Sequence, residues 1–340
     1  MVSWIEFGPA AEAEAALAER RAFEALEGFL ARRWRTSWAE ERTHCFVARR
    51  AGEVVCSIFA LELPLYWPDG AGGLEVRPVA ALDALVTPPR HRRRGFAGAL
   101  LEWVQQWAED RGMAATALFS EIGPAYYERR GFRVVPLPFH RGPLPPPPRT
   151  AGVASRRGGT GGSAYRSRER EVARPFITDD LQAVARAYEA TAQKCPLAVA
   201  RDLGYWRYHL EHSRFVEDLH SDEPDMHDFV VTQGDVTAYV RSRSDGDIFT
   251  VLEAACLPGE EEALGGLVSS ELERAAGEGC IRLVLHLQPG FPPMPHLELR
   301  ESWYETLVIR PTPRCAEDFD RFLARAPDGA HPYMFRPDYF

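Results

Sequence analysis

The sequence contains almost no lysine: among its 40 basic residues, only Lys194 is a lysine. Arginine, alanine, glycine and proline are abundant instead, which we take as a sign of a bacterial source and not of function. Long apolar runs are also missing, since none approaches the roughly 18 residues that a membrane-spanning helix needs. The start, MVSWIEFGPA, lacks the basic and apolar regions of a secretion signal. We therefore expect a cytoplasmic protein with no membrane partner.

Patterns for several kinds of catalysis are missing as well. The six cysteines form no C-x-x-C pair and lie in mostly apolar surroundings, so we expect reduced core residues: Cys45, Cys56, Cys195, Cys256, Cys280 and Cys315. No histidines and cysteines have the spacing of metal ligands, and no serine lies in a G-x-S-x-G motif. These absences argue against a metal site and against a serine hydrolase.

Length and composition favour two domains. With 340 residues, of which 45% are apolar, the chain can bury a large core and is long for a single domain. Proline, glycine and arginine dominate residues 141–175, which we interpret as a linker with a candidate strand at its end. The sequence thus predicts a first domain over 1–140 and a second domain over 176–340. The aromatic end of the chain, HPYMFRPDYF, is expected to dock onto the fold.

Charge is unevenly distributed along the chain. The formal net charge is −1 over residues 1–140, +6 over 141–175 and −14 over 176–340. An acidic second half favours cationic partners, because it attracts them and repels anions. Nucleic acid would need a basic surface with interleaved aromatic residues, and only the linker is basic. We expect no nucleic-acid partner.

The most informative stretch runs from Leu82 to Leu101, LDALVTPPRHRRRGFAGALL. The alternation of residues up to Val86 predicts a half-buried strand, and the prolines that follow end it because proline cannot donate to a sheet ladder. Beyond Gly95, apolar residues recur at helical spacing to about Asp110. The free amides and the dipole at the start of this helix favour an anion, and the arginines of the loop can bind phosphate oxygens. The stretch therefore predicts a diphosphate site.

Two nucleotide-binding loops do not fit this stretch, because it has no G-x-x-x-x-G-K-[ST] and lacks the second glycine of G-x-G-x-x-G. Residues 92–97, RRRGFA, resemble instead the R/Q-x-x-G-x-G/A acetyl-CoA signature of the GNAT acyltransferase superfamily. Residues 118–136, LFSEIGPAYYERRGFRVVP, resemble the Y-x-x-x-G-F ending of the same superfamily. The combination of TPPxHRRRGxA with SEIGxxYY also resembles the fungal lysine N-acetyltransferases.

The resemblance implies an α/β (α+β) fold with a mixed central sheet, and acetyl-CoA as co-substrate without a metal. Amides at the strand end would pair with the pantetheine arm of CoA, at Leu85, Val86 and Thr87. The loop residues that would hold the diphosphate are Arg92, Arg93, Arg94, Gly95, Phe96 and Ala97. Tyr127 matches the tyrosine that protonates the leaving thiolate. The alternative is that Tyr127 only packs and Tyr126 faces the site.

An alkyl ammonium must lose a proton before it attacks a thioester, so a carboxylate is needed near the acceptor. Glu121, in the S-E-I-G turn, and Asp83, on the strand, are the candidate bases. Either could instead cap a turn or face solvent. His91 is expected to be a solvated loop histidine.

The second half repeats the order of elements of the first. Helices are expected over 178–194, 201–212 and 260–276, with strands over 228–232, 236–241, 248–255 and 281–287. We interpret this half as a degenerate GNAT-like domain, as in tandem acyltransferases. Where the diphosphate loop would be, it carries Glu260, Glu261 and Glu262, which would repel phosphate. The second half is therefore expected to be a scaffold or a wall on the acceptor side.

These patterns predict an N-acetyltransferase that moves an acetyl group from acetyl-CoA to a primary amine by direct attack in a ternary complex. The acceptor would be a small or peptidyl amine, lysine-like by the closer resemblance. The alternatives are a catalytically silent acyl-CoA sensor built on the same loop and a scaffold that acts through the linker.

Overall fold

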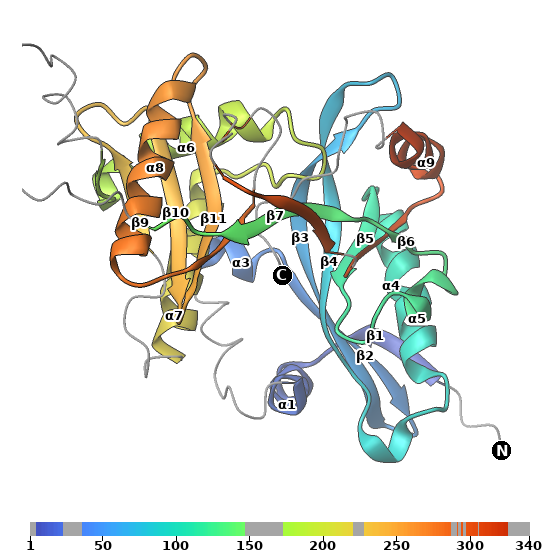
Figure 1. The fold of residues 1–340 in the computed structure, drawn as a ribbon. Helices are drawn as coiled ribbons and strands as arrows, with labels where there is room; N and C mark the ends of the chain where they lie inside the picture. The colour runs from blue at the N-terminus through green and yellow to red at the C-terminus, as the bar shows by residue number, and fades with distance from the viewer. Residues whose placement is uncertain are drawn as a thin grey trace, which may run out of the picture.

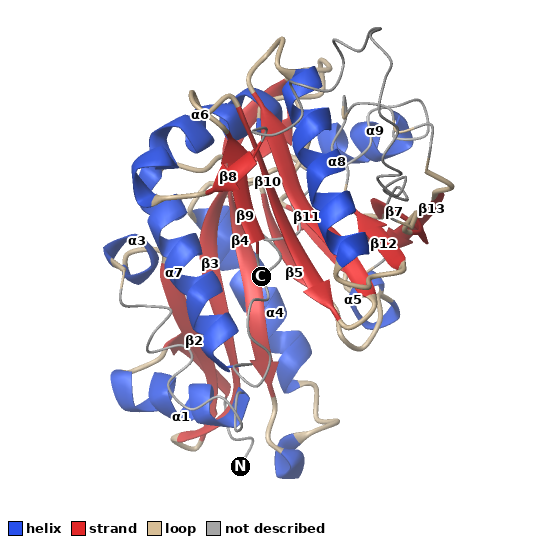
Figure 2. Cartoon of the chain, turned by 60° about the vertical axis from the view of Figure 1, so that its left-hand side comes forward, coloured by secondary structure: helices blue, strands red, loops and turns tan. Residues whose placement is uncertain are grey.

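The computed structural model describes residues 5–22, 36–146, 173–219, 228–286, 291, 294, 297–304 and 306–325. Within these residues the chain forms two mixed sheets with flanking helices (Figure 1, Figure 2). The predicted α/β class is confirmed.

The first sheet has the strand order β1-β2-β3-β4-β5-β14-β6. Its strands are β1 (Ile5–Pro9), β2 (Thr43–Arg50), β3 (Glu53–Pro68), β4 (Leu74–Val86), β5 (Ala115–Phe119), β6 (Arg133–Val134) and β14 (Leu307–Pro311). The helices of this part are α1 (Glu12–Ala22), α3 (Ser37–Glu40), α4 (Phe96–Asp110), α5 (Ala125–Glu128) and α9 (Ala316–Arg325). Among the described strands of this sheet, only β4 and β5 pair in parallel; the other neighbours are antiparallel.

The second sheet has the order β13-β7-β12-β11-β10-β9-β8. Its strands are β7 (Leu137–Pro143), β8 (Ala173–Pro175), β9 (Asp228–Thr232), β10 (Ala238–Asp245), β11 (Ile248–Cys256), β12 (Arg282–Leu285) and β13 (Arg300–Tyr304). The helices are α6 (Leu181–Ala192), α7 (Leu203–Leu219) and α8 (Glu261–Gly277). Here β11 and β12 form the parallel pair, joined through α8 as β4 and β5 are joined through α4.

The two sheets exchange one strand each. From the first half of the chain, β7 pairs with β12 and β13, and Figure 1 shows it in green, extending toward the second half. From the second half, β14 inserts between β5 and β6, where Leu307 faces Phe119 and Val308 faces Val134. The inserted Leu307, Val308 and Ile309 are fully buried. A division at residue 140 therefore follows the order of the chain but not the sheets.

Backbone hydrogen bonds along β3 also connect the two halves of the chain. The amide of Tyr66 donates to the carbonyl of Ala198 at 2.9 Å, and the amide of Leu197 donates back to Tyr66 at 2.8 Å. The amide of Ala200 also donates to the carbonyl of Pro64 at 2.8 Å. Most residues of β3 are buried, which explains its nearly continuous apolar sequence.

Helix α4 forms where the sequence predicts it. Phe96, Leu100, Leu101, Val104 and Ala108 are buried against the sheet, at the spacing of one helical face. The helix ends at Asp110, and the left-handed Gly112, with φ of +71°, redirects the chain toward β5. The predicted docking of HPYMFRPDYF and residues 147–172 of the predicted linker lie outside the described residues.

Candidate active site

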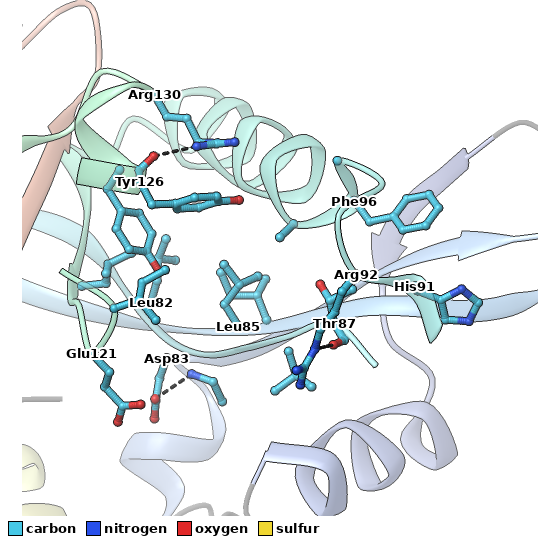
Figure 3. A pocket seen from close by; sticks show the side chains of 18 of the residues that line it. Leu82, Asp83, Leu85, Thr87, His91, Arg92, Phe96, Glu121, Tyr126 and Arg130 are labelled. Carbon is cyan, nitrogen blue, oxygen red and sulfur yellow. Dashed lines mark hydrogen bonds between the residues drawn. The ribbon is translucent and has the colours of Figure 1, made fainter. Parts of the chain in front are cut away.

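The site begins where β4 and β5 separate. The parallel pairing covers only Val79–Ala81 against Ala115–Ala117, while β4 continues to Val86 and β5 to Phe119. Between the diverging strands lies a cleft of about 1020 Å³, shown in Figure 3. Among the described residues, no strand therefore pairs with the β5 side of the last β4 residues, which line the cleft.

A bulge in β4 accompanies the separation. Ser57 of β3 pairs with Val86 of β4, and Phe59 pairs with Asp83. One residue separates the paired positions on β3 and two separate them on β4, so β4 carries one extra residue. Ala84 adopts a φ of +52°, in the left-handed region, and its amide donates to Oδ1 of Asp83 at 2.6 Å. The bulge redirects the end of β4 beside the cleft.

The loop between β4 and α4 closes one end of the cleft. Nε of Arg92 donates to the carbonyl of Thr87 at 3.0 Å, which fixes the loop after the strand end. Gly95 precedes α4 with a φ of +84°, and no heavy atom lies within 4 Å of where its Cβ would be. Open space thus adjoins the first amides of a 15-residue helix, which is the arrangement that binds an anion.

Most of the predicted donor-binding residues line this cleft: Leu85, Val86, Thr87, Arg92, Arg93, Gly95, Phe96 and Ala97. Arg94 is exposed and is not among the lining residues. The phosphate loop, residues 87–97, therefore supplies two lining arginines in addition to the helix start.

Tyr127 lies in the wall of the same cleft, on the short helix α5. It is only 7% exposed, and its ring packs edge-on against Phe132 and Tyr126. Burial raises the pKa of the Tyr127 phenol above its usual value, and Tyr126 adds to the shift. Tyr127 therefore keeps its proton at neutral pH. Tyr126 lines the cleft too, so the geometry places both rings at the site.

Both candidate carboxylates, Asp83 and Glu121, line the cleft. In the view of Figure 3 they lie on the left, whereas Phe96 and His91 lie on the right. Glu121 is exposed in a turn that Ser120 stabilises, since the Ser120 hydroxyl donates to the carbonyl of Gly123 at 2.7 Å. Both carboxylates thus line the cleft on the side away from Phe96 and His91 in this view.

Arg130 is a lining residue that the sequence analysis missed. Its guanidinium carbon lies 3.7 Å from the centre of the Tyr126 ring, and Nη1 donates to the Tyr126 carbonyl at 2.6 Å. A Cβ on Gly98, in the first turn of α4, would lie 3.0 Å from Nε of Arg130. Gly98 therefore lets a further cation that lines the cleft rest against the first turn of α4.

The expectation that His91 is solvated is wrong. His91 is 9% exposed and lies against Phe96, with Nε2 at 3.2 Å from Oε1 of Glu53 and 3.1 Å from Nε of Arg90. The hydrogen bond from His91 holds the pKa of Glu53 below its usual value. The imidazole thus ties the phosphate loop to the β2–β3 hairpin. No local signal in the sequence points to the partner, Glu53, because it lies 38 residues away.

The equivalent position in the second half, the start of α8, is acidic. At the start of α8, Oε1 of Glu261 accepts the amide of Gly259 at 3.2 Å. Backbone hydrogen bonds from Glu261 itself and from Gly259 lower the pKa of the Glu261 carboxyl. Glu260 and Glu262 add negative charge beside Glu261, so the start of α8 carries three carboxylates where the first half carries arginines.

The described part of the chain shows neither a membrane-spanning helix nor a cluster of metal ligands. None of its helices is long and apolar enough to cross a membrane. Nor do three or more His, Cys, Asp or Glu side chains gather there as possible metal ligands.

With this geometry in hand, comparison with known proteins identifies the type of fold. Residues 12–132, which hold the β4–α4 loop and Tyr127, match the model of the acetyltransferase (GNAT) family. The chain resembles a solved protein of Enterococcus faecalis described as a probable N-acyltransferase (TM-score 0.64, 10% identity, 94% of this chain and 75% of that one). It also resembles a GCN5-related N-acetyltransferase of Anabaena variabilis (TM-score 0.61, 13% identity, 92% and 74%). The structure is thus a GNAT fold with two GNAT-like domains.

The chain is also similar to two further proteins, one by structure and one by sequence. Eis1 of Mycobacterium abscessus matches 91% of this chain and 74% of its own, with a TM-score of 0.59 and 19% identity. An aminoglycoside N(6')-acetyltransferase type 1 of Serratia marcescens is 39% identical over 54 residues, which are 16% of this chain and 37% of that protein. The chain thus matches only about a third of the length of this curated relative. None of these matches supports the closer likeness to fungal lysine N-acetyltransferases.

Proposed function

We propose that the protein is an N-acetyltransferase that moves the acetyl group of acetyl-CoA to a primary amine. The observation that carries the proposal is the separation of β4 from β5 next to the phosphate loop. It puts an open strand edge, a helix start and a buried tyrosine in one cleft. The GNAT family match over residues 12–132 supports the same reaction class.

The donor would lie along the cleft as an additional strand between β4 and β5. Its diphosphate would rest on the amides at the start of α4, with Arg92 and Arg93 as counter-charges. Its pantetheine arm would pair with the free edge of β4 at residues 85–87. The thioester would then lie near Tyr127 and the carboxylates.

The chemical step needs no group beyond donor, acceptor and protein. The neutral amine nitrogen attacks the thioester carbon, and the carbon–sulfur bond of the tetrahedral adduct then breaks to give an amide and the CoA thiolate. The phenol of Tyr127 donates the proton that the sulfur takes up. The proton that the amine loses passes to Asp83 or Glu121, directly or through water.

The acceptor would be a cationic amine entering at the carboxylate end of the cleft. Asp83 and Glu121 both line the cleft, away from Phe96 and His91 in the view of Figure 3, and the second half of the chain has a net charge of −14. Lysine, a peptidyl amine and an aminoglycoside all fit this description. The similarity over 54 residues to an aminoglycoside N(6')-acetyltransferase makes the last a specific candidate.

The proposal is tested by incubating the full chain with acetyl-CoA and a panel of amines, and identifying products by mass. The panel should contain lysine, a lysine-containing peptide, an aminoglycoside and a neutral hydroxylamine. We expect one or more cationic amines to gain an acetyl group while free thiol is released in equal amount. Donor binding without turnover on any amine would favour the sensor instead, and absence of CoA binding would refute both.

A further inference from the structure

A second hollow lies in the other half of the molecule, apart from the donor cleft. It is a groove of about 900 Å³ over strands β7, β12 and β13, which lie side by side in the second sheet (Figure 2). Its volume is in the range of about 300–1,000 Å³ that is usual for small-molecule sites. The lining residues differ entirely from those of the donor cleft.

Strand register shows which side chains share the groove. Arg141 on β7 pairs directly with Val284 on β12 and with Arg300 on β13, and paired residues of antiparallel strands point to the same face. Phe139, two residues before Arg141, lies on this face as well and stacks on the buried His286 with ring centres 6.1 Å apart. The groove therefore combines apolar walls with two arginines that face each other.

Apolar side chains continue to the mouth of the groove. Ile281 is 61% exposed, although isoleucine is a residue that usually becomes buried. Ile248, Pro143 and Leu299 also line the groove. An exposed apolar wall of this kind marks a surface that gains stability when a ligand covers it.

The charges of the groove leave one positive charge uncompensated. Arg282 is held by the carboxylate of Asp247, with Nε at 3.0 Å from Oδ2. Arg141 and Arg300 form no ion pair within the described residues, and Glu298 is the one acid among the lining residues. Two free arginines and one acid give a net charge of +1.

We propose that this groove binds a small amphipathic anion, with a single carboxylate or phosphate head and an apolar tail. The head would lie between Arg141 and Arg300, whose like charges destabilise each other across the strands unless an anion joins them. The tail would lie along Phe139, Val284 and Ile281. The inference is independent of the proposed acetyl transfer.

The test is calorimetric titration of the full chain with decanoate below its micellar concentration, in the presence of excess CoA. We expect one decanoate per chain, and weaker binding of butanoate because its tail covers less apolar surface. Decyltrimethylammonium, with the same tail and the opposite charge, should not bind. Decyl phosphate should bind like decanoate, since arginine holds both heads.

Three variants locate the binding. Arg300→Glu and Arg141→Glu should each weaken decanoate binding about tenfold or more, the loss expected for a charged hydrogen bond. Arg186→Glu, at an exposed arginine of α6 outside the groove, should bind as the wild type does. Arg300→Glu should not lower the melting temperature, because it replaces a like-charge pair by an opposite-charge pair.

Three outcomes would overturn the inference. One is equal decanoate binding in all three variants. Another is binding to anionic vesicles with none to free decanoate or decyl phosphate, which would indicate a membrane surface. The third is self-association of the wild type that Arg300→Glu abolishes while decanoate has no effect, which would make the groove an interface between copies of the chain.

Discussion

Gly95 is the residue on which donor binding depends most directly. We predict that Gly95→Glu abolishes CoA binding in calorimetry, because it adds a side chain and a negative charge where the diphosphate would rest. Gly112→Glu is the matched control. Gly112 has a φ of +71°, close to the +84° of Gly95, and a Cβ would meet open space at both positions, but Gly112 does not line the cleft. Both variants should lose similar stability. CoA affinity lost equally in both would mean that strain, and not the site, is responsible.

Tyr127 is the proposed acid of the reaction. Tyr127→Phe should lower kcat by about 10²- to 10⁴-fold while donor affinity stays nearly unchanged, as expected when a proton donor is lost. Tyr126→Phe should have a much smaller effect. Because burial raises the pKa of Tyr127 above its usual value, the wild type should lose no activity through this group below about pH 10. Similar losses in both variants would reassign Tyr127 to packing.

Arg130 offers a test of the part of the site that only the structure reveals. We predict that Arg130→Gln raises the Kd for CoA about tenfold, the usual scale for one charge-assisted hydrogen bond. Arg129→Gln, at the exposed neighbour that does not line the cleft, should leave the Kd unchanged. If Arg130→Gln weakens the binding of dephospho-CoA as much as that of CoA, Arg130 contacts the diphosphate. If the variant weakens the binding of CoA alone, Arg130 contacts the 3′-phosphate. An unchanged Kd in Arg130→Gln would remove this role.

At the level of elements, β14 is expected to stabilise both halves at once. Ile309→Ala should lower the free energy of unfolding by about 2–5 kcal/mol, as for other fully buried isoleucines. Ile281→Ala makes the same chemical change at a side chain that is 61% exposed, and should cost less than about 0.5 kcal/mol. Urea unfolding followed by tryptophan fluorescence measures both. A small effect of Ile309→Ala would mean that β14 is dispensable to the first sheet.

Elements with local signals could be predicted, and elements held by distant partners could not. The β4–loop–α4 unit is encoded within residues 82–110 by alternation, two prolines and a glycine, so the ends of β4 at Val86 and of α4 at Asp110 agree with the prediction, whereas β4 begins at Leu74, eight residues before the predicted stretch. Segment 307–311 has only five residues and no turn signal that assigns it to a sheet. Its position between β5 and β6 depends on pairing with residues almost 200 positions earlier, which periodicity does not report.

The same distinction applies to the site. Tyr127, Glu121 and the phosphate loop could be proposed because each belongs to a short motif. Arg130 precedes a helix-ending glycine, as solvated arginines often do, and its contact with α4 depends on the space left by Gly98. The burial of His91 depends in turn on a hairpin glutamate far away in the sequence.

At the level of the whole molecule, the uneven charge should influence catalysis. If the acidic second half attracts the acceptor, kcat/KM for a cationic amine should fall as salt rises, because the screening length shrinks from about 10 Å at 0.1 M to 3 Å at 1 M. A neutral amine, measured with the donor saturating, should show no such fall. Identical salt profiles, or a preference for an anionic amine, would exclude attraction while leaving acetyl transfer in place.

The exchanged strands also bear on how the chain is made. During synthesis, β5 emerges well before its partner β14, and at typical rates of 5–20 residues per second the interval is roughly 10–40 s. Throughout that time the nascent chain presents an unpaired apolar edge, the kind of surface on which chains aggregate. The nascent chain should therefore need chaperones until residue 311 has been synthesised. A chain truncated before residue 307 should aggregate, even though it contains every residue that lines the donor cleft.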